Sequence, residues 1–592
     1  MDPLSGIDAT FLYLEQPHTP MHVGSVLVFE GSMRFDEFRE TLASRIHLVP
    51  RMTQRLLTVP LDLGKPYWVE DPDFDLDLHL QYVALPRPGN WRQLRRLASR
   101  TFSVPVDRNR PLWEMVFVEG LDQISQVPPG SVALISKVHH AAIDGVSGAD
   151  MMSILFDVSA KPRPIEPPAP RSVTAVPNEL QFLLETGRRI VRAPRQLPEL
   201  LRDGVRALRA GSATRVKGIE APPQPFSAPN SPLNQTVSVK RVWNTALLSL
   251  DRVKGLKRAL QCTLNDVVLA ICAGALREYL QLHDALPEQP LVSMVPVSTR
   301  GDDAHGAMGN QISAILVQLA TDVDDPIERV KAARRHALAG KAYQDAIGAG
   351  TLADVAEFVP FALANNAARL YSRFGMVKRH RPICNLVITN VPGPQRDLYV
   401  ARHRLLCSMG MAPIIDGMGL IITVLSYNGV LSISPTSSAA IMPDIDVFAR
   451  LLREHANALE MAVLERHPPA TESAGANGRA ADIPGMFEQL RGLLVARPVE
   501  DSLPAGTFQF CVTGSAQGQW TVVPRERTVS AGETASPDAT LTILDEDLVK
   551  ILHGTLDPQI AFVQGKLRVE GEIGDAIALC TLLSGGAAAP GR

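Results

Sequence analysis

The chain has few cysteines, and their positions do not suggest a disulfide framework or a metal site. Its 592 residues include six cysteines, none of them in a C-x-x-C spacing. Disulfide scaffolds are short and dense in cysteine, so a reducing compartment is the simpler expectation. The helical H-E-x-x-H arrangement is also missing, and the adjacent histidines described below have no nearby ligand to complete a metal set. We therefore expect no metal and no cofactor.

Long apolar runs and an excess of one charge are missing as well. No stretch reaches about 18 apolar residues, so we expect no transmembrane helix. The first residues lack the basic start and continuous apolar run of a signal peptide. The 59 Lys and Arg and 62 Asp and Glu give a net charge of −3, which argues against nucleic acid as a partner. Since 45% of the residues are hydrophobic, a large core can still be buried.

Several catalytic signatures are missing too. No G-x-S-x-G motif is present, which argues against a serine-hydrolase elbow. The chain contains no P-loop pattern and no complete G-x-G-x-x-G after a strand, which argues against common nucleotide folds.

Two changes of composition divide the chain. Residues 161–234 are rich in proline at both ends, and residues 465–482 form a small, polar stretch typical of a flexible linker. We therefore expect a first block over residues 1–160, a connector, a second block over 235–464, and a small third domain over 483–592. Both large blocks mix helical and strand patterns, with strands expected over residues 22–29 and 132–139 of the first block, which favours an α/β fold.

The connector carries a basic, broken amphipathic pattern. Residues 181–218 hold nine Arg or Lys and three acidic residues, and two prolines interrupt the apolar stripe. A solvated helix packed on the body is one interpretation, and attachment to an anionic membrane surface is the other.

The most informative segment is SVALISKVHHAAIDGVSGADMMSILF, residues 131–156. Its β-rich part ends at His139 and His140, and Asp144-Gly145 then marks a turn. Successive side chains of a strand point to opposite faces, so we expect only one of the two histidines to face a site. Such a histidine could act as a general base near neutral pH. Two satisfied core histidines are the alternative from these residues alone.

The segment HHAAIDG, residues 139–145, resembles the HHxxxDG signature of the CoA-dependent acyltransferase superfamily. Further segments are similar to the bacterial wax ester synthase/diacylglycerol acyltransferase family. They are Pro111-Leu112-Trp113 before the histidines, the opening LSGIDATFLYLE, Asn265-Asp266 at a helix start, Gly309-Asn310, and Asn390-Val391-Pro392-Gly393-Pro394. The resemblance covers most of residues 1–462.

This resemblance implies two halves like those of chloramphenicol acetyltransferase, with the site between them. It implies transfer of an acyl group from acyl-CoA, as substrate, to diacylglycerol or a long-chain alcohol. By the same analogy His140 is the base, His139 is its structural neighbour, and Asp144 beside Gly145 pairs with Arg300. Oxyanion donors would come from Asn265, Thr389 or Asn390. Local alternatives remain, because Thr263 and Asp266 also fit a helix capping box and residues 390–394 fit a simple turn.

The third domain resembles the sterol carrier protein type 2 family, most specifically in the segment AFVQGKLRVEG. Such domains are α+β folds with an apolar lipid tunnel, so local lipid delivery is one expectation and a purely stabilising domain is the other.

Rival functions are a non-catalytic lipid transfer protein and an acyltransferase whose acceptor is held on a carrier protein. We expect a cytoplasmic location, with a membrane or lipid-droplet surface as a further partner.

Overall fold

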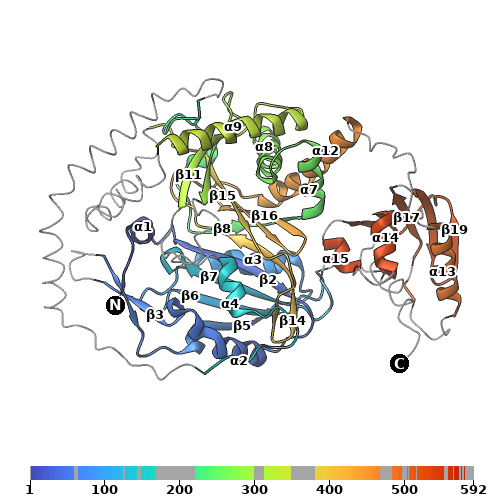
Figure 1. Cartoon of the computed structure of the whole chain (residues 1–592), viewed down its shortest axis with the longest axis horizontal. Helices are drawn as coiled ribbons and strands as arrows, with labels where there is room; N and C mark the ends of the chain where they lie inside the picture. Colours follow the sequence, from blue (N-terminus) through green and yellow to red (C-terminus); the bar gives the residue numbers. More distant parts are fainter. Residues whose placement is uncertain are drawn as a thin grey trace, which may run out of the picture.

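The computed structural model describes residues 2–58, 65–124, 127–142, 148–167, 221–298, 312–347, 380–466 and 483–580, the last range with gaps at 497–502, 505, 515, 553–555, 557, 564–565, 572–574 and 577–578. It is a mixed α/β structure, as predicted. Two large sheets with their helices form one body, and a smaller α+β domain follows at the C-terminal end (Figure 1).

The first large sheet has the strand order β13-β14-β2-β7-β6-β5. Its strands are β5 (Leu80–Ala84), β6 (Trp113–Glu119), β7 (Val132–His139), β2 (His22–Phe29), β14 (His403–Met411) and β13 (Tyr399–Val400). Strand β2 runs antiparallel to β7, and this register places His22 opposite His139. The helices of this half are α1 (Gly6–Leu14), α2 (Phe35–Arg45), α3 (Trp91–Ser103) and α4 (Gly148–Leu155). A small sheet of β1 (Asp2–Pro3), β4 (Tyr67–Glu70) and β3 (Gln54–Leu57) lies beside them.

The second large sheet has the order β11-β10-β12-β15-β16-β8, with β9 also paired to β16. Its strands are β8 (Arg241–Trp243), β9 (Ala246–Ser249), β10 (Val292–Ser298), β11 (Ile312–Gln318), β12 (Leu386–Pro392), β15 (Leu420–Tyr427) and β16 (Val430–Ser438). Its helices are α7 (Leu250–Ala259), α8 (Leu264–Leu282), α9 (Pro326–Ile347) and α12 (Ile445–Arg466). Helix α8 is buried along nearly its whole length and forms the centre of this half's hydrophobic core.

The two halves share a strand. Strand β14 comes from the region that follows β12, yet it pairs with β2 of the first sheet, with Gly410 opposite Ser25. It also packs against β15 and β16 of the second sheet, where Ser432 Oγ donates to the Ser408 carbonyl at 2.9 Å. Leu398, Val400 and Leu405 are buried in the core of the first half. The body is therefore joined by an exchanged strand and not only by a connector.

The C-terminal domain has a five-stranded sheet in the order β19-β18-β17-β20-β21. Its elements are α13 (Ile483–Ala496), β17 (Phe508–Thr513), β18 (Gly518–Val523), β19 (Thr528–Ala531), β20 (Ala539–Leu544), α14 (Asp545–Leu552), α15 (Pro558–Val563) and β21 (Leu567–Gly571). These elements enclose a hydrophobic core of their own, which includes Phe487 stacked on Trp520. In Figure 1 this domain lies to one side of the body, with α15 turned toward it.

Among the described helices, none is by itself long and apolar enough to cross a bilayer, although the pair α7 and α8, bent by 102°, meets the length and composition test together. The six cysteines form no disulfide, and five of them are buried. The described residues hold no group of three His, Cys, Asp or Glu that could bind a metal ion.

Candidate active site

The two adjacent histidines stand where a buried strand becomes a turn. Strand β7 ends at His139, and residues His140–Ala142 form a short 3-10 helix. His139 is 1% exposed, whereas His140 keeps partial exposure. Because β7 ends at His139, the predicted alternation of strand side chains does not extend to His140, and the two histidines differ in exposure at the start of the turn.

His139 is held in place by its neighbours. Its Nδ1 accepts a hydrogen bond from the backbone N–H of Ala141 at 3.1 Å, and its Nε2 lies 3.5 Å from Glu15 Oε1, a distance for ionic contact rather than a hydrogen bond. Because Nδ1 is an acceptor, a neutral His139 carries its proton on Nε2, facing Glu15. These contacts hold the buried His139 ring in one position.

Glu15 ties this histidine to the N-terminal helix. Its Oε1 accepts from the backbone N–H of Met21 at 3.1 Å, and its Oε2 accepts from Arg108 Nε at 2.5 Å. Burial alone would raise the pKa of Glu15, but the contacts with His139, Arg108 and the Met21 N–H lower it to about 2. Glu15 is thus a carboxylate at neutral pH.

His140 lies against an aromatic ring. The ring of Phe11 on α1 stacks on the imidazole with centroids 3.7 Å apart and planes 12° apart. The backbone N–H of His140 donates to the Met21 carbonyl at 2.8 Å, which fixes the start of the turn. Its Nδ1 is buried and has no well-formed hydrogen bond. Burial, with a smaller contribution from the neighbouring His139, lowers the pKa of His140 to about 4 against an opposing effect of the residue's own backbone. The ring is therefore neutral near pH 7.

A third histidine, His22, completes this cluster from the facing strand. Its Nε2 donates to the Phe102 carbonyl at 2.8 Å, and it is fully buried. Burial and the positive charge of Lys137 lower the pKa of His22 to about 3. Two neutral imidazoles and one carboxylate therefore surround His139.

Asp144, Gly145 and Arg300 lie outside the described residues, so the predicted Asp144–Arg300 pair stays a prediction. The prolines and arginines of the connector between residues 168 and 220 lie outside them as well.

Asp266 has the capping role that the residues alone allowed. Its carboxylate accepts from the Thr263 backbone N–H at 2.8 Å, while its own N–H donates to Thr263 Oγ1 at 3.2 Å. This capping box starts α8 and satisfies backbone donors that the first helical turn leaves unpaired. Asn265 is half-buried beside it.

Thr389 and Asn390 lie in β12, next to the seam between the halves. Thr389 is paired with Thr423 of β15, and Thr423 lies directly below Gly410 of β14. Gly410 in turn neighbours Ser25 of β2, which pairs with Ser136 of β7, three residues before His139. Strand pairing within each sheet and the packing of β14 on β15 thus connect β7 to β12. Within the described part of the chain, no hydrogen bond joins His140 to Asn265, Thr389 or Asn390.

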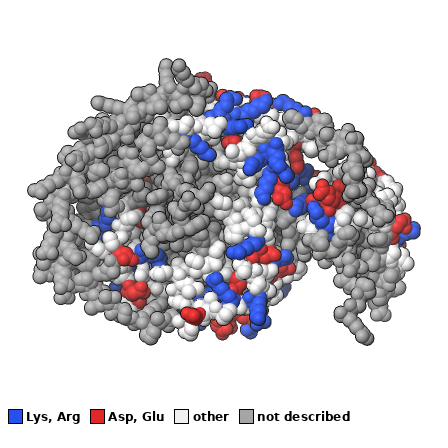
Figure 2. All heavy atoms as spheres, viewed as in Figure 1, with Lys and Arg blue, Asp and Glu red and all other residues white. Residues whose placement is uncertain are grey.

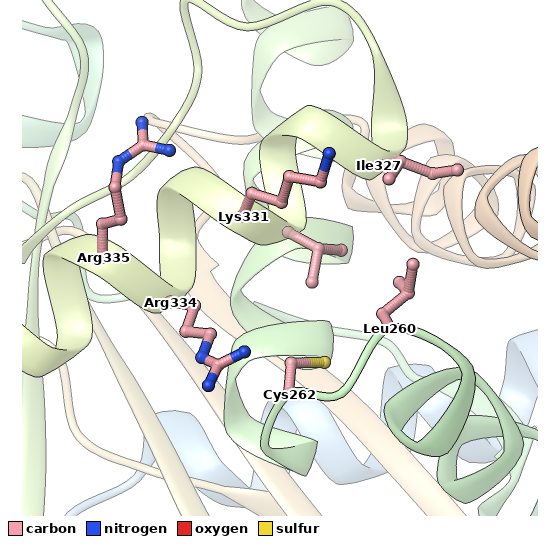
Figure 3. A pocket seen from close by; sticks show the side chains of 7 residues that line it. Leu260, Cys262, Ile327, Lys331, Arg334 and Arg335 are labelled. Carbon is pink, nitrogen blue, oxygen red and sulfur yellow. The ribbon is translucent and has the colours of Figure 1, made fainter.

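A cavity of about 230 Å³ opens between the loop that joins α7 to α8 and helix α9 (Figure 3). Its lining includes neither histidine and consists of Leu260, Cys262, Ile327, Val330, Lys331, Arg334 and Arg335. Arg334 Nη1 donates to the Gln261 carbonyl at 2.5 Å, so this cation also closes the loop before α8.

Sequence reasoning did not identify Phe11, Glu15 or His22 as parts of the site. A signal for His22 was available in the sequence. His22 begins one predicted strand and His139 ends another, so antiparallel pairing of these two strands places the two histidines opposite each other. Phe11 and Glu15 lie in the opening segment that resembles the family, but nothing in that segment indicated their contacts with the histidines, which join residues about 125 positions apart.

Comparison with known proteins agrees with this architecture. The family model described as the wax ester synthase/diacylglycerol acyltransferase catalytic domain matches residues 4–268, and the C-terminal domain model of the same family matches residues 308–460. A protein of Mycobacterium tuberculosis, provisionally named a diacylglycerol O-acyltransferase, is 35% identical over 471 residues, which are 77% of this chain and 90% of that protein. The chain belongs to the wax ester synthase/diacylglycerol acyltransferase family.

Two further family members extend this result. The O-acyltransferase WSD of Acinetobacter baylyi is 33% identical over 482 residues, which are 79% of this chain and 98% of that protein. The solved structure of the wax ester synthase/diacylglycerol acyltransferase from Marinobacter aquaeolei aligns with 78% of this chain and all of that one, with 28% identity and a TM-score of 0.57. Both relatives match the length of the acyltransferase body. The third domain is matched separately, because the SCP-2 sterol transfer family model covers residues 500–584.

Proposed function

We propose that this protein transfers a fatty acyl group from acyl-CoA to the hydroxyl group of diacylglycerol or a long-chain alcohol, with His140 as the general base. The products are triacylglycerol or a wax ester, and the thiol of CoA is released. The observation that carries the proposal is a family member's fold in which His140 is neutral, partly exposed and stacked on Phe11, while its neighbour His139 is fixed by Glu15.

The reaction needs a base because an alcohol is a poor nucleophile at neutral pH. In the proposed step, His140 Nε2 takes the hydroxyl proton as the alcohol oxygen bonds to the thioester carbon. The tetrahedral intermediate then loses the thiolate as the carbon–sulfur bond breaks, and the imidazolium returns the proton to sulfur. Protons and electron pairs balance within the two substrates and one imidazole, so no covalent acyl-enzyme is required.

The surroundings of His140 support this role. Its Nδ1 is buried against the main chain, which leaves Nε2 as the nitrogen for substrate. Since the pKa of His140 is about 4, nearly every molecule holds the neutral base at pH 7. The same low value means that the imidazolium is a strong acid, which favours return of the proton to the departing thiolate.

Hydrogen-bond donors must stabilise the oxyanion, and one good donor contributes about 3–4 kcal/mol to catalysis. We assign this role to Thr389 or Asn390, because their strand lies next to the seam crossed by β14, and we keep Asn265 as the alternative. We assign Asp144 to a structural ion pair with Arg300, since a buried carboxylate without a partner is costly. We propose no cofactor besides the acyl-CoA substrate.

The match of the third domain to the SCP-2 sterol transfer family supports lipid binding as the role of this domain. The substrates and products are strongly apolar. This favours a reaction at the cytoplasmic side of a membrane or at a lipid-droplet surface, where acyl-CoA is available.

The test is release of CoA thiol by purified protein given palmitoyl-CoA with diolein or hexadecanol. We expect His140→Ala and His140→Gln to lose at least about a hundredfold in turnover, the usual size of a general-base contribution. Both variants should keep the fold, which the thermal unfolding midpoint of each one checks against the parent.

Each contrary outcome has a distinct meaning. Full turnover by His140→Ala would contradict the base assignment. Lipid binding by the parent protein without thiol release from either alcohol would favour the lipid transfer function, and release only with a carrier-protein-bound acceptor would favour that acceptor.

A further inference from the structure

The C-terminal domain contacts the acyltransferase body through paired charges. Lys566 Nζ lies 3.2 Å from Asp251 Oδ2 on α7, and Arg568 Nη2 lies 2.9 Å from Glu460 Oε2 on α12. Arg568 also reaches Asn457 Oδ1 at 3.5 Å. Both cations flank the start of β21, while both acids belong to the second half of the body.

Glu460 is shared between the two bodies. Its Oε1 accepts from Arg252 Nε of α7 at 2.9 Å, and its Oε2 also contacts the same guanidinium. One carboxylate therefore lies between a guanidinium of the body and one of the C-terminal domain. An isolated exposed ion pair contributes about 0–1 kcal/mol, whereas a network gains because one side chain is already ordered. Arg252 thus orders the Glu460 carboxylate in the position where it contacts Arg568.

The contact differs in kind from the interior of either body. The C-terminal domain buries its apolar side chains in its own core, and the core residues of the body end at Val463. Helix α15 lies against β9, beside the paired charges, and Figure 2 shows acidic and basic side chains mixed over this boundary. Contacts between domains of one chain are typically more polar than permanent interfaces, and the paired charges here fit that pattern.

We propose that the C-terminal domain docks on the acyltransferase body through an ionic latch formed by Asp251 and Glu460 on the body and Lys566 and Arg568 on the domain. The latch holds β21 and α15 beside α7, α12 and β9. A linker alone would only raise the local concentration of the domain, whereas the latch gives it one orientation relative to the body. The domain's role in lipid binding rests on the proposed function, but the docking does not.

The 3.2 Å distance between Lys566 Nζ and Asp251 Oδ2 suits a zero-length carbodiimide cross-link, which joins an amine to a carboxylate without a spacer. The full chain is treated without substrate, digested, and the Asp251–Lys566 cross-linked peptide is quantified by mass spectrometry. We expect this peptide from the parent at low salt and a several-fold decrease in 0.5 M NaCl, because salt screens exposed charges.

Substitutions at the other pair test the latch without changing the cross-linked residues. Glu460→Arg places a cation between Arg252 and Arg568, so the cross-link should fall at least fivefold, and Glu460→Gln should lower it less. The double variant Glu460→Arg with Arg568→Glu restores opposite charges and should recover most of the cross-link.

Two controls make the result specific. Glu454→Arg reverses a charge on the same helix, at a residue paired with Arg450 instead of the domain, and should leave the Asp251–Lys566 yield unchanged. The Lys331–Glu328 pair on α9, 2.8 Å apart, supplies an internal cross-link that should stay constant in every variant. Absence of the Asp251–Lys566 peptide at low salt, or an unchanged yield in Glu460→Arg, would overturn the proposal. Since no turnover is measured, failure of the latch is distinct from failure of the acyltransferase activity.

Discussion

At the scale of single residues, the two neighbouring histidines differ in which residue at the N-terminal helix contacts each of them. Glu15 gives His139 a fixed ionic neighbour, whereas Phe11 covers His140 with an apolar ring. The aromatic cover disfavours a charged imidazole at His140 by excluding water. The two adjacent histidines therefore have different surroundings, and in the proposed mechanism His140 is the one that exchanges a proton with substrate.

Removing the Phe11 ring should change the acid limb of the pH profile. The base works when neutral, and His140 is neutral above its pKa of about 4, so turnover of the parent should stay flat from pH 8 down to about pH 5. In Phe11→Ala, water reaches the imidazole and its pKa should rise toward the ordinary 6.5. At pH 5.5 only about a tenth of the base would then be neutral, a loss of about tenfold relative to pH 8.

The measurement is kcat/KM for thiol release against pH in both proteins. Phe11→Leu, which keeps an apolar cover without an aromatic ring, is the matched control and should keep most of the low-pH activity. An acid limb in Phe11→Ala that coincides with that of the parent would show that Phe11 does not set the pKa of His140.

At the scale of elements, the strand β14 decides how the halves meet. Strand β14 lies very close to β15 where the two cross. A Cβ added to Gly410 would lie 2.4 Å from Thr423 Cγ2 and 3.1 Å from Leu425 Cδ1. The Trp243 indole N–H also donates to the Gly410 carbonyl at 2.9 Å, so the strand cannot move away without losing that bond. Glycine at this position lets two sheets pack at backbone distance.

Gly410→Ala should therefore destabilise the body by about 1–3 kcal/mol, the usual cost of overpacking. The free energy of unfolding from urea titration checks this value. Gly255→Ala on α7 is the matched control, because no atom lies within 4 Å of the added Cβ and alanine is the better helix former, so its stability should be equal or slightly higher. Equal stability of Gly410→Ala and the parent would mean that the crossing can relax.

The sequence predicted most elements because their signals are local. The strands His22–Phe29 and Val132–His139 were predicted with their observed bounds, since β-rich runs are interrupted there by turn residues. The capping box of Thr263 and Asp266 likewise marked the start of α8. The pairing of β14 with β2 was not predicted, because residues nearly 400 positions apart form it and no local pattern encodes such a partner. The contacts of Phe11 and Glu15 with the histidines were not predicted for the same reason, whereas the histidine pair itself was predicted as part of the site.

At the scale of the whole molecule, the cores divide the chain into an acyltransferase body and an attached domain. The hydrophobic clusters of the body contain residues up to Val463, and the cluster of the C-terminal domain contains only residues from Ile483 onward. Between the halves of the body the division is incomplete, since Leu405 and Tyr427 are buried together with first-half residues such as Phe29. The halves should therefore unfold as one unit, and the C-terminal domain as another.

Ending the chain after Arg466 should accordingly leave a folded acyltransferase. Helix α12 is complete at that residue, and its buried face contacts α8 and α9 of the body. The truncation removes the partners Lys566 and Arg568, but each exposed ion pair contributes only about 0–1 kcal/mol. We expect calorimetry of the full chain to show two transitions, of which the truncated protein keeps the one belonging to the body. Thiol release with detergent-dispersed hexadecanol should stay within about twofold of the full chain, because His140, Phe11 and Glu15 all remain. An aggregated or inactive 1–466 protein would show that the C-terminal domain is part of the body's fold, and a single shared transition in the full chain would give the same answer without truncation.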